Sequence, residues 1–258
     1  MKKLNLNKKD IAYLSIIALL LVAIVLLSIV TWHANQRRIS WETSGYYKDK
    51  VTSFGIQNAN LSKGQIVFVG DSITDLYPLD DYYADLPLAS YNRGIGGDTT
   101  QGVIDRLKVS IFDLEPSVIV LMIGTNDVDL GIPNDQIVVN YRKILDEIKE
   151  NQPMVDLYFV SVIPQNKVLQ ASSGLDVTKN NKTIKALNGE IEMLCKEYGH
   201  TFIDLYPDLL DDDGYLRKDC SDDGLHLNAG GFEIWSALLK PFWKNKGAKA
   251  LKNALCSN

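Results

Sequence analysis

The sequence predicts an α/β fold in which helices cover both faces of a central parallel sheet. Five short apolar segments have the length and composition of buried strands, and amphipathic helical segments alternate with them. Parallel neighbours in a sheet need crossover connections, which these helical segments supply. A third observation, a long uncharged segment near the N-terminus, predicts one transmembrane helix before this domain.

Each predicted strand is a short apolar run bounded by glycine, proline or polar residues. The clearest is 118–123, which is rich in β-branched residues and lies between Pro116 and Gly124. The segment beginning at Thr201 is expected to be a central strand, with His200 at its start. The five predicted strands are 65–69, 88–92, 118–123, 157–163 and 201–204.

The segments between the strands have the periodicity of amphipathic helices. Asn134 is expected to cap a helix, and Gly199 occupies a natural C-cap position after another. The first helix carries one apolar stripe made of Ile137, Val138, Tyr141, Ile144, Leu145 and Ile148. The second carries Ile184, Leu187, Ile191, Leu194 and Tyr198. Near the C-terminus, Phe232, Trp235 and Leu239 indicate a third amphipathic segment.

The N-terminal segment 11–32 contains no charged residue and ends in Trp32, which suits a membrane interface. About 22 residues at about 1.5 Å each extend roughly 33 Å, enough to cross a bilayer core. Four lysines precede the segment and two arginines follow it: Lys2, Lys3, Lys8, Lys9, Arg37 and Arg38. The positive-inside rule therefore favours a single-pass protein with a cytoplasmic N-terminus and an extracellular C-terminal domain.

A cleaved signal peptide is the competing interpretation of this segment. Its apolar region is normally about 7–15 residues long and ends at a small-x-small site. Here the apolar run is longer, and Trp32 stands where a small residue is needed. We therefore expect an uncleaved anchor. The predicted organisation is a cytoplasmic N-terminus (1–10), the anchor (11–32), a juxtamembrane segment (33–63), the catalytic domain (64–245) and a basic tail (246–258).

Composition excludes several classes of partner and site. A net charge of -5 and a pI of about 5.3 argue against nucleic acid, which requires clustered Lys and Arg. Three scattered cysteines, Cys195, Cys220 and Cys256, form neither a disulfide framework nor a CxxC zinc site, so unpaired thiols are expected. The acidic run at 211–213 lacks the spacing of a calcium loop and indicates a solvated turn.

Polar, glycine-containing segments follow the predicted strands at the edge where ligands bind in open parallel sheets. They are GDSIT at 70–74, NRGIGGDTT at 92–100 and GTND at 124–127, and a fourth, DGLHLN at 223–228, precedes the last helix. Each one alone indicates a turn or a helix cap. Their joint occurrence in this order can assemble the nucleophile, base, orienting acid and oxyanion donors of a serine hydrolase.

The residues of these segments suggest specific roles. Ser72 lies at a strand-to-helix turn that can expose its hydroxyl as the nucleophile. Elimination leaves His226 as the base, since His33 abuts the apolar segment and His200 opens a strand, and Asp223 can orient it. The expected oxyanion donors are the backbone N–H groups of Ser72 and Gly97 and the side-chain amide of Asn126.

At these residues the chain resembles the SGNH (GDSL-type) hydrolase family, named for the Ser, Gly, Asn and His of four blocks. Ser72, Gly97, Asn126 and His226 occupy those positions, and Asp223 completes the set. The second block is most similar to the platelet-activating-factor acetylhydrolase-like branch. The resemblance covers roughly 65–243. It implies a flavodoxin-like three-layer α/β/α fold and metal-free hydrolysis of esters, acetyl groups or thioesters, with no cofactor.

The expected partners are a small-molecule, lipid or glycan ester and the membrane. Arg93 and Asp98, which flank the second block, are expected either to tune the site or to form a salt bridge. Tyr77, Tyr82 and Tyr83 follow the nucleophile and either line a substrate subsite or pack in the core.

Two other functions fit parts of the pattern. A metallophosphoesterase would use Asp71, Asn126, Asp127 and His226 as ligands, but such sites usually draw on several histidines. A tethered carbohydrate- or lipid-binding module would keep the fold without the activity. The intact set of catalytic residue types favours the enzyme.

Overall fold

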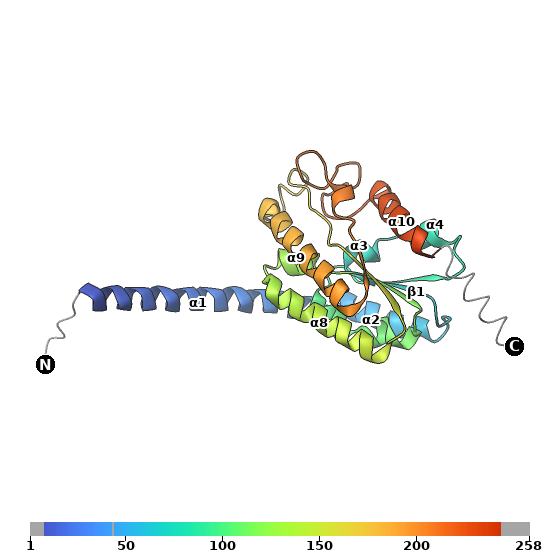
Figure 1. The fold of residues 1–258 in the computed structure, drawn as a ribbon, viewed down its shortest axis with the longest axis horizontal. Coiled ribbons are helices and arrows are strands. Elements are labelled where there is room, and N and C mark those ends of the chain that lie inside the picture. The colour runs from blue at the N-terminus through green and yellow to red at the C-terminus, as the bar shows by residue number, and fades with distance from the viewer. Residues whose placement is uncertain (1–7, 43, 244–258) are drawn as a thin grey trace.

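The computed structural model describes residues 8–42 and 44–243, in which an α/β domain follows a long N-terminal helix (Figure 1). Within this part of the chain, five parallel strands form a sheet in the order β2-β1-β3-β4-β5. The strands are β1 (Ile66–Gly70), β2 (Ser90–Gly94), β3 (Val118–Met122), β4 (Asp156–Val160) and β5 (Thr201–Ile203). The predicted α/β class with a parallel sheet is confirmed, and every predicted strand overlaps an observed one.

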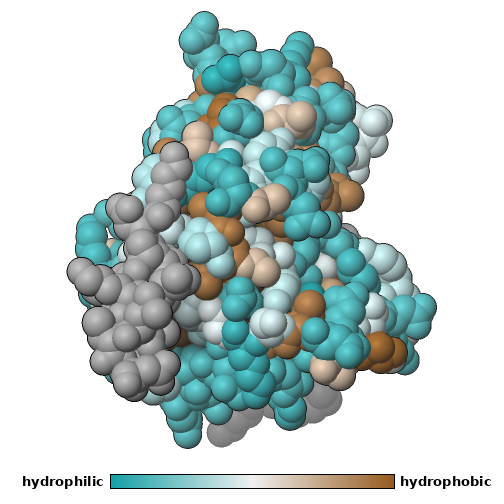
Figure 2. Space-filling model, turned by 90° about the vertical axis from the view of Figure 1, so that its right-hand side faces the viewer, coloured by the Kyte–Doolittle hydropathy of each residue, from teal (hydrophilic) through white to brown (hydrophobic). Residues whose placement is uncertain are grey.

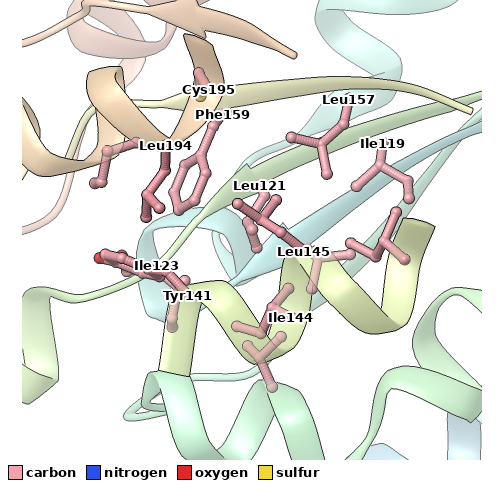
Figure 3. Close-up of a cluster of buried hydrophobic side chains, with 14 of the residues drawn as sticks. Ile119, Leu121, Ile123, Tyr141, Ile144, Leu145, Leu157, Phe159, Leu194 and Cys195 are labelled. Atoms are coloured by element: carbon pink, nitrogen blue, oxygen red, sulfur yellow. The ribbon is translucent and has the colours of Figure 1, made fainter. Parts of the chain in front are cut away.

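The helices cover both faces of the sheet. Alternate side chains of each strand point to opposite faces, so that Val67 and Val69 of β1 join one apolar cluster and Ile66 and Phe68 join the other. On the first face lie α8 (Asn134–Asn151) and α9 (Val177–Tyr198), whose stripes pack on β3 and β4 (Figure 3). On the second face lie α3 (Ser72–Asp75), α4 (Leu79–Tyr83) and α10 (Ala229–Trp243). Three short helices complete the connections: α5 (Thr100–Asp105), α6 (Leu107–Ser110) and α7 (Thr125–Asp129).

Two details of the sequence prediction were wrong. β5 is an edge strand that pairs only with β4, so His200 does not open a central strand. It is short and its first two residues are only half-buried, unlike β1 and β3, which are buried throughout. Asn134 is the first residue of α8 rather than its cap, because the carbonyl of Pro133 already accepts from Gln136 and Ile137. The expected C-cap of α9 is confirmed, with Gly199 in the left-handed conformation at φ 74°.

The N-terminal helix α1 (Lys8–Glu42) contains the whole predicted anchor. Its large apolar side chains between Tyr13 and Ile29 are exposed, at 47–69% each. Within the residues described, no helix combines the length and apolar character that crossing a membrane requires. The face of the domain on the side away from α1 is mostly hydrophilic, with scattered apolar patches (Figure 2).

The segment 33–63 contains a second helix, α2 (Gly45–Asn58), which packs on the domain through buried Tyr47 and Phe54. The thiols of Cys195 and Cys220 are buried and unpaired. Cys256, the predicted tail 246–258 and most of the predicted cytoplasmic segment 1–10 lie outside the described residues.

Candidate active site

The predicted site segments meet at the carboxyl end of β1, in the middle of the sheet. The chain leaves β1, pairs β2 on one side of it and then returns to pair β3 on the other. The crossover directions therefore reverse at this strand, and in open α/β sheets ligands bind at such a reversal, beyond the carboxyl ends of the strands. Ser72, Gly97 and Asn126 belong to these three segments.

The nucleophile turn is formed by close packing and a helix cap. A Cβ atom on Gly70 would lie 2.2 Å from the carbonyl oxygen of Met122 and 2.2 Å from Thr74 Oγ1, so only glycine fits there. Asp71 caps α3 by accepting a hydrogen bond from Ile73 N at 3.0 Å. Ser72 is thereby the first residue of α3, where its backbone N–H has no intrahelical acceptor.

The structure brings the three predicted triad side chains together. His226 Nε2 lies 2.8 Å from Ser72 Oγ, and His226 Nδ1 lies 2.6 Å from Asp223 Oδ2. The other carboxylate oxygen of Asp223 accepts from the backbone N–H groups of Leu225 and His226, both at 2.8 Å. Partial burial acts to raise the pKa of Asp223, but the hydrogen bonds from His226 and these backbone groups outweigh it and hold that pKa below its ordinary value. Asp223 is therefore an ionised carboxylate at neutral pH, suited to stabilise an imidazolium.

Two residues that sequence reasoning missed hold the histidine loop, Ser221 through its side chain and Asn166 through its backbone. Ser221 Oγ accepts from Gly224 N at 2.8 Å, and Asn166 N donates to the Gly224 carbonyl at 2.8 Å. Gly224 has φ 82°, a left-handed conformation that favours glycine. Asn166 lies in the segment after β4, and nothing in the sequence pattern indicates its contact with a loop so far along the chain.

The three predicted oxyanion donors belong to the segments that follow β1, β2 and β3. Gly97 has φ 76° in the loop after β2, and Asn126 Nδ2 donates to the Asp98 carbonyl at 2.9 Å, which holds α7 against that loop. The second amide hydrogen of Asn126 remains for a ligand. Among the described residues, no acceptor receives the backbone N–H of Ser72 or Gly97. The arrangement therefore offers donors for a developing oxyanion.

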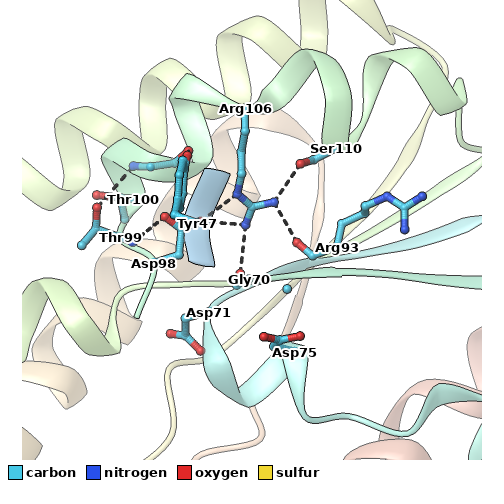
Figure 4. A network of polar contacts seen from close by, with 12 residues as sticks. Tyr47, Gly70, Asp71, Asp75, Arg93, Asp98, Thr99, Thr100, Arg106 and Ser110 are labelled. Atoms are coloured by element: carbon cyan, nitrogen blue, oxygen red, sulfur yellow. Dashed lines mark hydrogen bonds and ion pairs between the residues drawn. The ribbon is translucent and has the colours of Figure 1, made fainter. Parts of the chain in front are cut away.

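A buried arginine connects the segments of the site (Figure 4). Arg106 pairs with Asp98 at 2.7 Å, and both side chains are only 1% exposed. Its guanidinium also donates to the carbonyls of Gly70 at 3.0 Å and Arg93 at 2.7 Å, and to Ser110 Oγ at 2.8 Å. Arg106 therefore ties the ends of β1 and β2 to the loop that carries Gly97.

Of the two roles expected for Arg93 and Asp98, Asp98 does form a salt bridge, but its partner is Arg106 and not Arg93. The guanidinium of Arg93 instead donates to Asn58 Oδ1 at 2.9 Å and Gln57 Oε1 at 3.3 Å, and lies over the Phe54 ring. It thus holds α2 on the sheet edge.

Two buried carboxyl groups support the site without belonging to the triad. Asp127 accepts from the backbone N–H and hydroxyl of Thr100, at 3.0 and 2.6 Å, which joins α7 to the start of α5. Burial raises the pKa of both Asp71 and Asp127 to about 7. In the part of the chain described, no cluster of three or more His, Cys, Asp or Glu side chains is arranged to hold a metal ion. The alternative ligands Asp71 and Asp127 have structural hydrogen-bonding roles instead.

The tyrosines after the nucleophile pack mainly in the core. Tyr77 stacks on Phe232 with ring centroids 4.5 Å apart, and its hydroxyl lies 2.9 Å from that of Tyr83. Tyr77 and Tyr83 are both 2% exposed, whereas Tyr82 is half-buried and donates to the Ala229 carbonyl. These rings join α4 to α10 and leave no room for a substrate beside Tyr77 or Tyr83.

We predict that Arg106→Met lowers the free energy of unfolding by about 3–5 kcal/mol, because it leaves the Asp98 carboxylate buried without its partner. Arg217→Met removes the exposed pair with Asp219 and should leave the free energy of unfolding nearly unchanged, because solvent screens that pair. Urea denaturation of the variants measures both. A double variant, Arg106→Met with Asp98→Asn, should lose less than the two single losses together; strict additivity would contradict this coupling.

We predict that Asp71→Asn weakens the dependence of stability on pH. The raised pKa means that the native state retains a proton which the unfolded chain releases near pH 4, so stability falls as pH rises from about 4 to about 7. The side-chain oxygen of asparagine still accepts the hydrogen bond from Ile73 N, but asparagine has no carboxyl group to titrate. Urea denaturation across that pH range should give a flatter profile for Asp71→Asn, but an unchanged profile for the exposed Asp212→Asn.

Comparison with known proteins is consistent with this geometry. The model of the GDSL-like lipase/acylhydrolase family matches residues 68–234, more than half of the chain. The alpha1 subunit of platelet-activating factor acetylhydrolase IB from Bos taurus is 28% identical over 196 residues, which cover 71% of this chain and 78% of the relative.

Solved structures show the same fold. A protein from Streptococcus pneumoniae, whose description relates it to platelet activating factor, has a TM-score of 0.72 at 26% identity, covering 82% of this chain and 98% of that chain. An acetylxylan esterase from Geobacillus stearothermophilus has a TM-score of 0.54 at 20% identity, covering 69% and 93%.

Proposed function

The chain belongs to the GDSL-like lipase/acylhydrolase family of carboxylic ester hydrolases, and from this premise we propose that it acts through an acyl-enzyme formed on Ser72. The observation that carries the proposal is the continuous hydrogen-bond chain from Ser72 Oγ through the imidazole of His226 to the Asp223 carboxylate. A nucleophile in contact with a base, and a base oriented by an acid, is the arrangement that activates a serine hydroxyl.

In the first half-reaction Ser72 Oγ attacks the ester carbonyl carbon while its proton passes to His226 Nε2. The negative charge on the tetrahedral oxygen is stabilised by hydrogen bonds from Ser72 N–H, Gly97 N–H and the free amide hydrogen of Asn126. Loss of one such donor typically raises the activation free energy by about 3–4 kcal/mol. The bond to the alcohol oxygen then breaks. The alcohol leaves with the proton from His226, and the acyl group remains on Ser72.

The second half-reaction repeats these steps with water. His226 Nε2 takes a proton from the water as it attacks the acyl carbon, and the same donors receive the oxyanion. The bond to Ser72 Oγ breaks, Oγ recovers the proton from His226, and the carboxylic acid is released. Asp223 keeps the imidazole in its productive orientation throughout both halves.

For the substrate we propose a short acyl group, such as acetyl, carried by a lipid or a glycan. The Bos taurus relative is named an acetylhydrolase, and the Geobacillus protein of the same fold is an acetylxylan esterase. Both names specify a small acyl group, while their alcohols differ. The acyl group is therefore the part of the substrate that these similarities favour.

We also propose that α1 anchors the enzyme to the cell membrane, with the catalytic domain outside. The exposed apolar side chains between Tyr13 and Ile29 support this location, since a water-exposed helix with such a surface is unfavourable. Lysines before the apolar segment support a cytoplasmic N-terminus.

We predict that the full-length chain floats with phosphatidylcholine vesicles in a density gradient and that Leu20→Lys with Ile24→Lys abolishes flotation. Each lysine at the centre of an inserted helix raises the free energy of membrane insertion by about 3 kcal/mol. Reaction with a fluorophosphonate should be equal in both proteins, which shows that the domain remains folded. A wild-type chain that stays at the bottom of the gradient would contradict the anchor.

We predict that Ser72→Ala lowers hydrolysis of p-nitrophenyl acetate, butyrate and octanoate by about a thousandfold or more, because no other group replaces the nucleophile. The variant should also fail to react with a fluorophosphonate. Ser172→Ala, at an exposed position, serves as the matched control and should retain wild-type rates. Equal rates for wild type and a folded Ser72→Ala protein would refute the proposed mechanism.

A further inference from the structure

Helix α2 precedes the region that matches the family model, yet its first turn reaches the nucleophile segment. Ser44 caps the helix by accepting from Tyr47 N, which places Tyr46 in the first turn. The Tyr46 hydroxyl donates to Asp75 Oδ2, and Lys50, one turn later on the same face, lies 2.6 Å from Asp75 Oδ1. Asp75 is the last residue of α3, which begins at Ser72.

Gly96 connects this cluster to the oxyanion loop. Its backbone N–H donates to Asp75 Oδ2 at 3.1 Å, and Gly97 follows it directly. A Cβ atom on Gly96 would lie 3.7 Å from Ser72 Cβ, 3.7 Å from the Tyr46 hydroxyl oxygen and 3.8 Å from Asp75 Oδ2. Ser72 and Tyr46 therefore border the same small space above Gly96.

Tyr46 presents its ring to solvent at this position. Its side chain remains 45% exposed although its hydroxyl is held by Asp75. Burial of the hydroxyl and its bond to Asp75 raise the pKa of Tyr46 to about 12, so that it stays a protonated donor at neutral pH. A ring whose hydroxyl is held by Asp75 and which is still partly exposed forms a wall beside Ser72.

The direction of the reaction indicates which part of the substrate meets this wall. The alcohol must leave on the side of His226, which protonates it, and the oxyanion must face Gly97 and Asn126. The acyl group takes the remaining direction from the carbonyl carbon, past Gly96 toward Tyr46.

We propose that Tyr46 is a substrate-contacting residue that limits the length of the acyl group accepted by Ser72. The inference rests on the proposed function, because it requires an acyl group on Ser72. It also makes α2 a part of the active site. Selectivity for short acyl groups then depends on a helix outside the four sequence blocks.

Substitutions at two positions test the proposal in opposite directions. In the full-length chain, Tyr46→Ala should raise the ratio of kcat/KM for p-nitrophenyl butyrate to that for acetate by about tenfold, the effect typical of an added or removed methylene contact. Gly96→Ala should lower the ratio, because its methyl group occupies the space between Ser72 and Tyr46. This alanine meets only ordinary van der Waals contacts, and Gly96 is not in the left-handed region, so the fold tolerates it.

Two further variants separate the wall from a structural role of α2. Tyr46→Phe keeps the ring and loses the bond to Asp75, so it should hold the ratio within about twofold while lowering both rates. Ile56→Ala, at an exposed position on the same helix, should change neither the ratio nor the rates.

The outcomes distinguish this inference from the proposed function. Labelling of Ser72 by a fluorophosphonate in every variant, together with an unchanged butyrate-to-acetate ratio in Tyr46→Ala, would overturn the role of Tyr46 and leave the nucleophile standing. A parallel fall in both rates with a constant ratio in Tyr46→Ala would also overturn it, because that result would show a purely positioning effect of the residue. Absence of labelling and hydrolysis in wild type would refute the proposed function, and the role of Tyr46 with it.

Discussion

The buried ion pair between Arg106 and Asp98 is the interaction on which the site's architecture depends. The Arg106 guanidinium joins the carbonyl of Gly70, at the end of β1, and that of Arg93, next to the end of β2, to the loop that carries Gly97, so the turn at Ser72 and the proposed oxyanion donor share one rigid support. A buried charge is unfavourable unless it is paired and hydrogen-bonded, and here nearly every donor of the guanidinium has an acceptor. Preorganised donors of this kind stabilise transition-state charge without having to reorient.

Close backbone packing and buried carboxyl groups complete this support. Gly70 allows the end of β1 to approach β3 and Thr74, which places Ser72 at the top of the sheet. Asp71 and Asp127, both fully buried, are used as a helix cap and a helix–helix connection. The carboxylate of the proposed triad differs from them in its environment: Asp223 is half-exposed and bonded by His226, and therefore remains ionised.

The elements of the fold could be predicted because their patterns are local. Buried β-branched runs such as 118–122 and the apolar stripes of α8 and α9 depend on neighbouring residues along the chain. Strand order is not local, and it was the edge position of β5 that the pattern failed to predict. The start of α8 differs from the prediction by one residue for a local reason, since the carbonyl of Pro133 already accepts the first hydrogen bonds of the helix.

The sequence by itself determined the chemistry of the candidate site: the types and order of Ser72, Gly97, Asn126, Asp223 and His226 at glycine-bearing strand ends indicate acyl transfer. The tertiary structure alone decided what surrounds them. In the folded chain Asp98 pairs with Arg106 and not with Arg93. Asn166 contacts the histidine loop, and Tyr46 lies beside Ser72. The physical reason is that reactive groups must be particular residue types, which a motif records. The groups that support them need only meet in space, and such contacts between distant segments arise when the sheet and its helices pack together.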